Sequence, residues 1–117
     1  MRSPRRVTSA FTLVEIMVVV VLIGLLATLA LPAFQRIRAA SQDKAVLNNA
    51  RQLSSAADSY YLESGFNFAP SVNLIGATNY VKLLSTVASE VYPDNFTQGI
   101  TLTVTGVGGA RTITYTP

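Results

Sequence analysis

Apolar side chains fill one continuous stretch of this chain, residues 11–31, which reads FTLVEIMVVVVLIGLLATLAL. About 20 helical residues, rising 1.5 Å each, cross the ~30 Å hydrocarbon layer of a bilayer, so the stretch predicts a membrane-spanning helix. Its single charged residue is Glu15. An ionised carboxylate inside a bilayer costs roughly 2.5–3.5 kcal/mol, so Glu15 is expected to have a partner.

The pattern becomes amphipathic over residues 33–64. Apolar positions recur at spacings of four and three, while charged positions recur every seven on roughly the opposite side. The apolar stripe is Val46, Ala50, Leu53, Ala57 and Tyr60, and the charged positions are Lys44, Arg51 and Asp58. With no Gly or Pro between Pro32 and Gly65, one helix is predicted from about Thr12 to Ser64, with Gly65 as its carboxyl-terminal cap. The stripe is interpreted as the core face of a small head domain.

The remainder predicts a loop region and a hairpin. Residues 65–98 are punctuated by Gly and Pro, and only Tyr80–Ala88 suggests a short helix. In residues 99–117, Ile100, Leu102 and Val104 alternate with threonines, a turn is expected over Gly106–Gly109, and residues 111–115 alternate again. Laid on the helix stripe, these strands would gain a core, so the predicted fold class is α+β.

The first ten residues resemble a targeting segment with a basic flank. They contain Arg2, Arg5 and Arg6, no acidic residue, and lead directly into the apolar run, which favours a cytoplasmic amino terminus. A secretory signal cut after Ala27 or Ala30 is the alternative, but the run is long for one. The net charge of +3 comes from these three arginines, because six basic and six acidic residues remain elsewhere. No nucleic-acid partner is therefore expected.

The residue types argue against catalysis. The chain contains no cysteine and no histidine, which removes disulfides, thiolate metal sites and the commonest general base. Its acidic residues show no paired spacing with a base, and no Lys-Ser/Thr pair follows the glycines at 106–109 as a phosphate-binding loop requires. The expectation is a non-enzyme with no metal and no cofactor.

A short basic leader ending in a small residue, followed by Phe-Thr-Leu-Val-Glu-Ile and an apolar helix, resembles the amino terminus of type IV pilins and type II secretion pseudopilins. The resemblance covers roughly residues 5–45. It implies that a prepilin peptidase cuts between Ala10 and Phe11 and N-methylates Phe11, and that Glu15 is the acidic residue used in assembly. Family members usually have Gly before the cut, and the small Ala10 should still fit a narrow peptidase site.

The resemblance also implies partners and a location. The expected partners are further copies in a helical filament, the prepilin peptidase, an assembly platform protein and an ATPase. The expected location is the bacterial inner membrane, crossed once, with the head in the periplasm, and after assembly a periplasmic or extracellular filament.

Cleavage before Phe11 would create an amine four residues upstream of Glu15, at a helix amino terminus that already favours a carboxylate. The amine could pair with Glu15 of the same chain or of a neighbouring copy. Alternatively, Glu15 reaches water at the headgroup level. Gly24 and Thr28, four residues apart, form either a helix-packing face or a lipid-exposed one. Pro32 either kinks the helix or is a tolerated residue at the membrane exit. Family members often have Gly and Pro at the positions of Gly24 and Pro32.

The expected organisation is a leader (1–10), a transmembrane and filament-core helix (11–32), an amphipathic helix (33–64), a variable loop region (65–98) and a hairpin (99–117). The predicted function is a structural subunit that is inserted, cleaved and polymerised. A single-pass anchored binding module that never polymerises, with the loop as its receptor, is the alternative. Pilus, secretion pseudopilus and DNA-uptake filament stay open, although the small cysteine-free head leans toward a pseudopilin.

Overall fold

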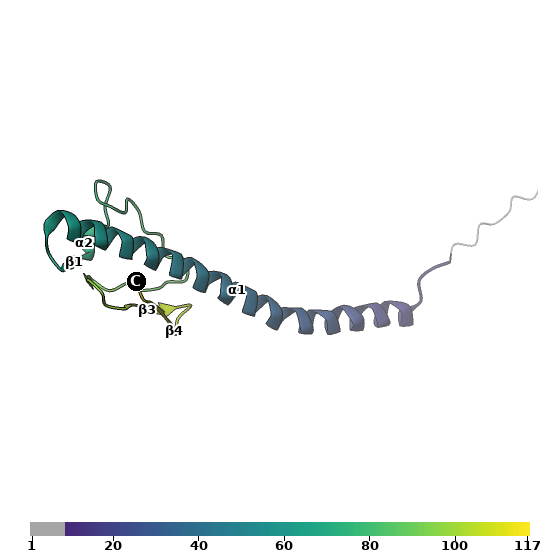
Figure 1. Cartoon of the computed structure of the whole chain (residues 1–117). Helices are drawn as coiled ribbons and strands as arrows, with labels where there is room; N and C mark the ends of the chain where they lie inside the picture. The colour runs from purple at the N-terminus through teal and green to yellow at the C-terminus, as the bar shows by residue number, and fades with distance from the viewer. Residues whose placement is uncertain (1–8) are drawn as a thin grey trace, which may run out of the picture. The chain divides into compact units, whose positions relative to one another are not determined.

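The computed structural model describes residues 9–117 and has an α+β arrangement. The expected leader falls almost wholly on residues 1–8, including Arg2, Arg5 and Arg6, and so lies outside the described residues. The chain divides into two compact units between Arg36 and Ile37. The elements are α1 (Leu13–Ser64), β1 (Phe68–Pro70), α2 (Ser71–Leu74), β2 (Asn95–Thr97), β3 (Leu102–Val107) and β4 (Arg111–Tyr115), drawn in Figure 1.

Helix α1 begins one residue after the predicted start and ends at the predicted residue, Ser64. Gly65 ends it as expected, because its positive φ of 73° is the left-handed conformation that glycine adopts without steric cost. The Gly65 N–H donates to the Tyr61 carbonyl oxygen at 2.9 Å. The helix continues through Pro32 without a break in its assignment.

The first part of α1 buries nothing. Every described residue up to Arg38 is exposed, including large apolar side chains such as Leu22, Leu29 and Phe34. Among the described residues, α1 is the one helix long and apolar enough to cross a membrane. Apolar surface of this extent needs cover that residues 9–117 do not supply.

The second part of α1 carries the core of the head, which we define as residues 37–117. Val46, Ala50, Leu53 and Ala57 are buried, which confirms the predicted stripe, and Lys44, Arg51 and Asp58 are exposed as expected. Tyr61, rather than Tyr60, completes the stripe, because the next step after Ala57 is four residues. Tyr60 is only partly buried, accepts a hydrogen bond from Asn73 through its hydroxyl (3.2 Å), and meets the ring of Tyr80 edge-on.

Strands β3 and β4 form the predicted antiparallel hairpin, which lies along the second part of α1 (Figure 1). Leu102, Val104 and Val107 are buried in the same core as the helix stripe, and the threonines between them are exposed. Two details of the prediction are wrong. Ile100 precedes the strand and is exposed, and Gly106 belongs to β3, where the pairing is irregular between Val104 and Val107.

A second, smaller antiparallel pair joins β1 to β2, with Ala69 opposite Phe96. Both of these residues are buried, so this pair closes the core near the carboxyl-terminal end of α1. The sequence did not predict these strands, because three residues are too few to show an alternating pattern.

The short helix expected over Tyr80–Ala88 is wrong, since the structure has no helix there and instead places the four-residue α2 at Ser71–Leu74. An isolated helix of nine residues is marginal in water. Here the backbone bonds elsewhere instead: the Val81 N–H donates to the Leu74 carbonyl (2.9 Å), and Asn49 on α1 donates to the Ser85 carbonyl (3.1 Å).

Glu90 is the one buried acidic residue among those described, at 4% exposure. Its carboxylate accepts hydrogen bonds from the Val87 N–H (3.0 Å), the Ala88 N–H (2.7 Å) and the Tyr92 hydroxyl (3.0 Å). Burial alone would raise the pKa of this carboxyl, but these hydrogen bonds outweigh burial and lower it. Burial, together with the hydrogen bond to Glu90, raises the pKa of Tyr92 to about 12. The carboxylate therefore ties the loop together in its ionised form.

Candidate functional site

The candidate site is the segment around the start of α1, where the expected processing and assembly residues lie. Ala10 and Phe11 are exposed and precede the helix, which begins at Leu13. The Ala10–Phe11 peptide bond thus lies in non-helical backbone, just before the first residue of α1. A protease needs its substrate in such a form, because helical backbone hydrogen bonds would have to open first.

Thr12 and Glu15 form a reciprocal cap at this helix start. The Glu15 N–H donates to the Thr12 hydroxyl oxygen at 3.2 Å, and the Thr12 N–H donates to a Glu15 carboxylate oxygen at 3.5 Å. This is the capping box, in which two unsatisfied backbone donors of the first turn are paired by side chains three residues apart. The first intrahelical bond, from the Ile16 N–H to the Thr12 carbonyl at 3.3 Å, closes the turn.

The sequence argument singled out Glu15 but missed Thr12. The signal was available, since Thr12-Leu13-Val14-Glu15 has the Ser/Thr-x-x-Glu spacing directly before an apolar run. The sequence placed Glu15 at a helix amino terminus that favours a carboxylate, but it did not identify the backbone donor that the carboxylate pairs with. The geometry shows that the same carboxylate also holds the helix terminus.

Glu15 has no ion pair within residues 9–117, where the single salt bridge joins Arg111 to Asp43 at 3.2 Å. The carboxylate is exposed and its longer capping contact, 3.5 Å, is weak by the usual distance criteria. It therefore remains available to a cation brought close to the helix start. The dipole of α1 favours the negative charge of the Glu15 carboxylate at this end.

The other predicted site residues lie along the exposed part of α1. A side chain at Gly24 would meet nothing within 4 Å, so packing within this chain does not require glycine there. The Thr28 hydroxyl donates to the Leu25 carbonyl at 2.7 Å, within its own helix. Pro32 lacks the N–H that would bond the Thr28 carbonyl. None of the three is brought near Glu15.

Residues 5–31 match the family model described as the prokaryotic N-terminal methylation motif. The match covers the predicted cleavage bond, the capping pair and the whole apolar run of residues 11–31. The amino-terminal part of this chain is therefore similar to that of type IV pilins. The α+β arrangement, with a long apolar helix leading into small antiparallel sheets, is pilin-like throughout the described residues.

The chain is also similar to curated pilins and fimbrial proteins. The chain is 41% identical over 61 residues to the fimbrial protein EcpC of Eikenella corrodens, covering 52% of this chain and 40% of that protein. It is 42% identical over 55 residues to the type IV major pilin protein PilE1 of Neisseria gonorrhoeae (47% of this chain, 33% of that protein). A fimbrial protein of Neisseria meningitidis serogroup B matches equally, over 47% of this chain and 32% of its own length.

The chain thus matches well under half the length of these pilins. These relatives are pilins and fimbrial proteins by name, and none of the three is named as a pseudopilin. No solved structure gives a significant match to the chain.

Proposed function

We propose that this protein is a structural subunit that is held in the bacterial inner membrane by α1, cleaved before Phe11, and then assembled into a helical type IV pilin-like filament. The observation that carries the proposal is the exposure of every described residue up to Arg38, in a segment that matches the methylation motif over residues 5–31. The names of the relatives support the same class.

The exposed apolar part of α1 is covered by lipid before assembly and by the same part of neighbouring copies afterwards. Exchanging acyl chains for other apolar helices is nearly neutral in hydrophobic free energy, since both are equally apolar. The direction of assembly then has to come from polar pairing and close packing. Glu15 supplies the first, and the small residues Gly24 and Ala27 allow the second.

Cleavage changes what surrounds Glu15. Before cleavage, Phe11 contributes an ordinary peptide N–H, and the one hydrogen bond that the Glu15 carboxylate accepts within the described residues comes from the Thr12 N–H. After cleavage, Phe11 carries an ammonium group adjacent to the capping residue. That group pairs with Glu15 of its own chain or of a neighbour, and in a low-dielectric filament core the neighbour's carboxylate fixes the register.

The remaining elements of the proposal follow from the family. A prepilin peptidase, an assembly platform protein and an ATPase serve this subunit, the amino terminus stays in the cytoplasm, and the head faces the periplasm. The chain needs no cofactor and carries out no catalysis of its own in this role.

Mass spectrometry of the mature protein from its bacterial membrane tests the processing step. The proposal predicts a mature chain that begins at N-methylated Phe11. An intact Met1, or a new terminus after Ala27 or Ala30, would contradict it. The intact form would instead favour the anchored binding module that does not polymerise.

The variants Glu15→Gln and Glu15→Asp test the assembly role. The Gln variant keeps the shape of the side chain without its charge and should still insert, but sheared filaments should fall at least tenfold, since one lost buried ion pair costs about 3–5 kcal/mol. The shorter but charged Asp variant should retain part of the yield. Equal filament yields from the Gln variant and the wild type would contradict the role of the charge.

A further inference from the structure

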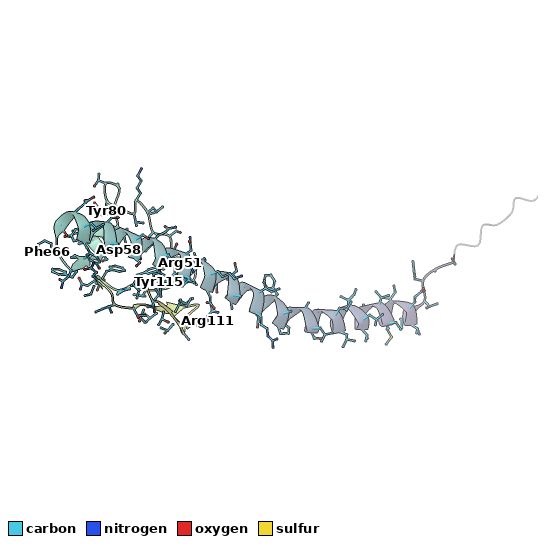
Figure 2. All side chains as sticks on the ribbon, viewed as in Figure 1. Arg51, Asp58, Phe66, Tyr80, Arg111 and Tyr115 are labelled. Atoms are coloured by element: carbon cyan, nitrogen blue, oxygen red, sulfur yellow. The ribbon has the colours of Figure 1, made fainter. Side chains whose placement is uncertain are left out.

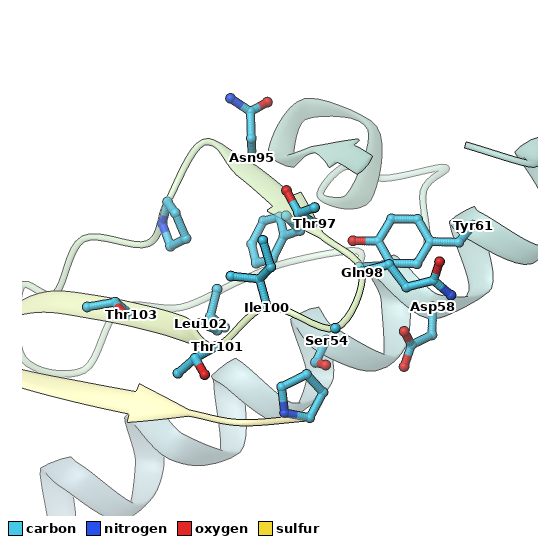
Figure 3. Close-up of a pocket in the computed structure, with 15 residues that line it drawn as sticks. Ser54, Asp58, Tyr61, Asn95, Thr97, Gln98, Ile100, Thr101, Leu102 and Thr103 are labelled. Carbon is cyan, nitrogen blue, oxygen red and sulfur yellow. The ribbon is translucent and has the colours of Figure 1, made fainter. Parts of the chain in front are cut away.

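The head contains a pocket of about 190 Å³ that is separate from the amino-terminal site. One wall is a face of α1, where Ser54, Asp58 and Tyr61 lie at spacings of four and three residues and therefore point the same way. The other wall is the segment from β2 into β3, which includes Phe96, Gln98 and Ile100. Figure 3 shows the pocket with these side chains as sticks.

Backbone hydrogen bonds fix the pocket wall that the segment from β2 into β3 forms. The Gln98 N–H donates to the Asn67 carbonyl at 3.0 Å, and the Ile100 N–H donates to the Thr97 carbonyl at 3.2 Å across a tight turn. Gly99 has a positive φ of 74°, as the third residue of such a turn requires. The loop is therefore held open beside α1 by backbone bonds, and its side chains are free to meet a ligand.

Tyr61 contributes a phenol hydroxyl to this pocket. Its side chain is 7% exposed, and its hydroxyl makes no hydrogen bond within residues 9–117. Figure 3 shows the ring reaching from α1 toward the β2 segment with its hydroxyl end leading. Burial, and secondarily the Asp58 carboxylate, raise the pKa of this phenol, so it is a protonated hydrogen-bond donor at neutral pH. This hydroxyl is open to the pocket, so an occupant of the pocket can accept its hydrogen bond.

The remaining lining defines what that occupant is. Asp58 accepts hydrogen bonds, Gln98 both donates and accepts, and neither uses its side chain elsewhere in the described part of the chain. No Lys or Arg lines the pocket and Asp58 disfavours anions. No group of three acidic residues able to hold a metal ion is present in the residues searched. Phe96, Ile100 and Leu102 add an apolar surface.

We propose that this pocket binds one neutral hydroxylated ring, a monosaccharide unit, either free or at the end of a glycan. Sugar hydroxyls both donate and accept, which matches a phenol donor, a carboxylate acceptor and an amide. The C–H face of the ring packs on Phe96 and Ile100. The volume is below the ~300 Å³ at which pockets for larger ligands begin, so a single ring is the expected size.

The test is amide NMR of the ¹⁵N-labelled full chain in micelles of a detergent that contains no sugar. Glucose, galactose and N-acetylglucosamine are titrated separately, with their methyl glycosides in a parallel arm. At least one should shift the amide signals of residues 97–101 saturably in the millimolar range, while those of residues 108–110 in the hairpin turn stay fixed. Equal binding of the methyl glycoside would indicate the end of a glycan, and loss of binding would indicate the free sugar.

Two variants and a matched control test whether the Tyr61 hydroxyl and the Asp58 carboxylate bind the sugar. Tyr61→Phe keeps the ring and removes the hydroxyl, and Asp58→Asn removes the charge, so each should weaken binding about tenfold, which is the usual worth of one such hydrogen bond. Tyr60→Phe alters the neighbouring tyrosine, which does not line the pocket, and should bind as the wild type does. Unchanged amide signals outside the pocket show that each variant is folded.

Several outcomes would overturn the proposal. One is no saturable shift with any of the sugars, and another is wild-type binding by Tyr61→Phe. If butylammonium chloride shifts residues 97–101 and the sugars do not, the pocket takes a cation. If raising the protein concentration alone shifts them, a second copy covers the pocket. Because the pocket lies wholly within the head, none of these results depends on filament assembly.

Discussion

Along residues 13–38, α1 exposes large apolar side chains such as Leu22 and Leu29, whereas between Val46 and Tyr61 it buries small and apolar ones against two short sheets. Both parts belong to one helix assigned without a break. The difference lies in where each part finds its apolar contacts. The head half finds them within its own chain, whereas the first half finds none among the described residues, and the proposed function assigns its cover to lipid and to other copies. Substitutions in the two parts should therefore have separable effects.

The largest effect is expected from Leu53→Ala. Leu53 is fully buried, so the variant should lose about 2–5 kcal/mol of head stability through lost burial and the cavity left behind. The same substitution at Leu22, which is 53% exposed on the same helix, should leave head stability unchanged. Urea unfolding of the full chain in micelles, followed by tyrosine fluorescence, measures both. If Leu22→Ala lowers the stability of the head as much as Leu53→Ala does, the two parts of α1 do not act separately.

A somewhat smaller effect is expected at Glu90. Because hydrogen bonding lowers the folded pKa of Glu90 below its ordinary value of 4.5, the unfolded state binds more protons in that range. The contribution of Glu90 is fully present above pH 4.5 and is lost as pH falls through the folded pKa. Glu90→Gln should lower the free energy of unfolding by about 1.5–3 kcal/mol at neutral pH. The variant should also lose less stability than the wild type as the pH falls below 4.5.

Urea midpoints between pH 3 and pH 7 measure the effect of Glu90, with ~1 pH unit as the useful spacing. Glu63→Gln is the matched control, because Glu63 is exposed and accepts its hydrogen bond from Tyr80 at the head surface. If the urea midpoint of Glu90→Gln still falls with decreasing pH as steeply as that of the wild type, groups other than Glu90 cause the loss of stability in acid.

The smallest effect is expected at Thr12. Thr12→Val removes the hydroxyl that accepts the Glu15 N–H, and loss of such a cap costs about 1 kcal/mol, or about fivefold in the local opening equilibrium. The exchange of the Glu15 amide proton should accelerate by that factor, while Thr12→Ser should leave it near the wild-type rate. Head stability should not change in either variant. If the Glu15 amide proton exchanges at the same rate in Thr12→Val and in the wild type, the Thr12 hydroxyl does not stabilise the helix start.

Much of the helical part of the fold could be predicted from the sequence, because its signals are local and repeated. The ends of α1 follow from Gly65 and from the start of the apolar run, and the buried positions follow from the helical period. The last position of the stripe shows the limit of that period. A step of three residues from Ala57 predicts Tyr60, which is partly exposed, whereas the buried residue is Tyr61, four residues on.

The rest of the head depends on contacts between distant residues. Pairing of Phe68–Pro70 with Asn95–Thr97 has no alternating pattern to reveal it, and the segment Tyr80–Ala88 loses its helical tendency to hydrogen bonds with Leu74 and Asn49. The pocket beside Tyr61 likewise forms only when the β2–β3 segment folds over α1. At the amino terminus, the local motif that predicted Glu15 contained the Thr12 cap as well.

The central claim is that lipid, and then other copies, cover the exposed apolar part of α1. The chain has no cysteine, so single cysteines at Leu22 and at Leu62, which is 88% exposed on the head, report on cover directly. In intact cells with a permeabilised outer membrane, a membrane-impermeant maleimide should label Leu62→Cys rapidly and Leu22→Cys at least tenfold more slowly, in line with the exclusion of water from a bilayer. Equal labelling of the two positions would contradict the account.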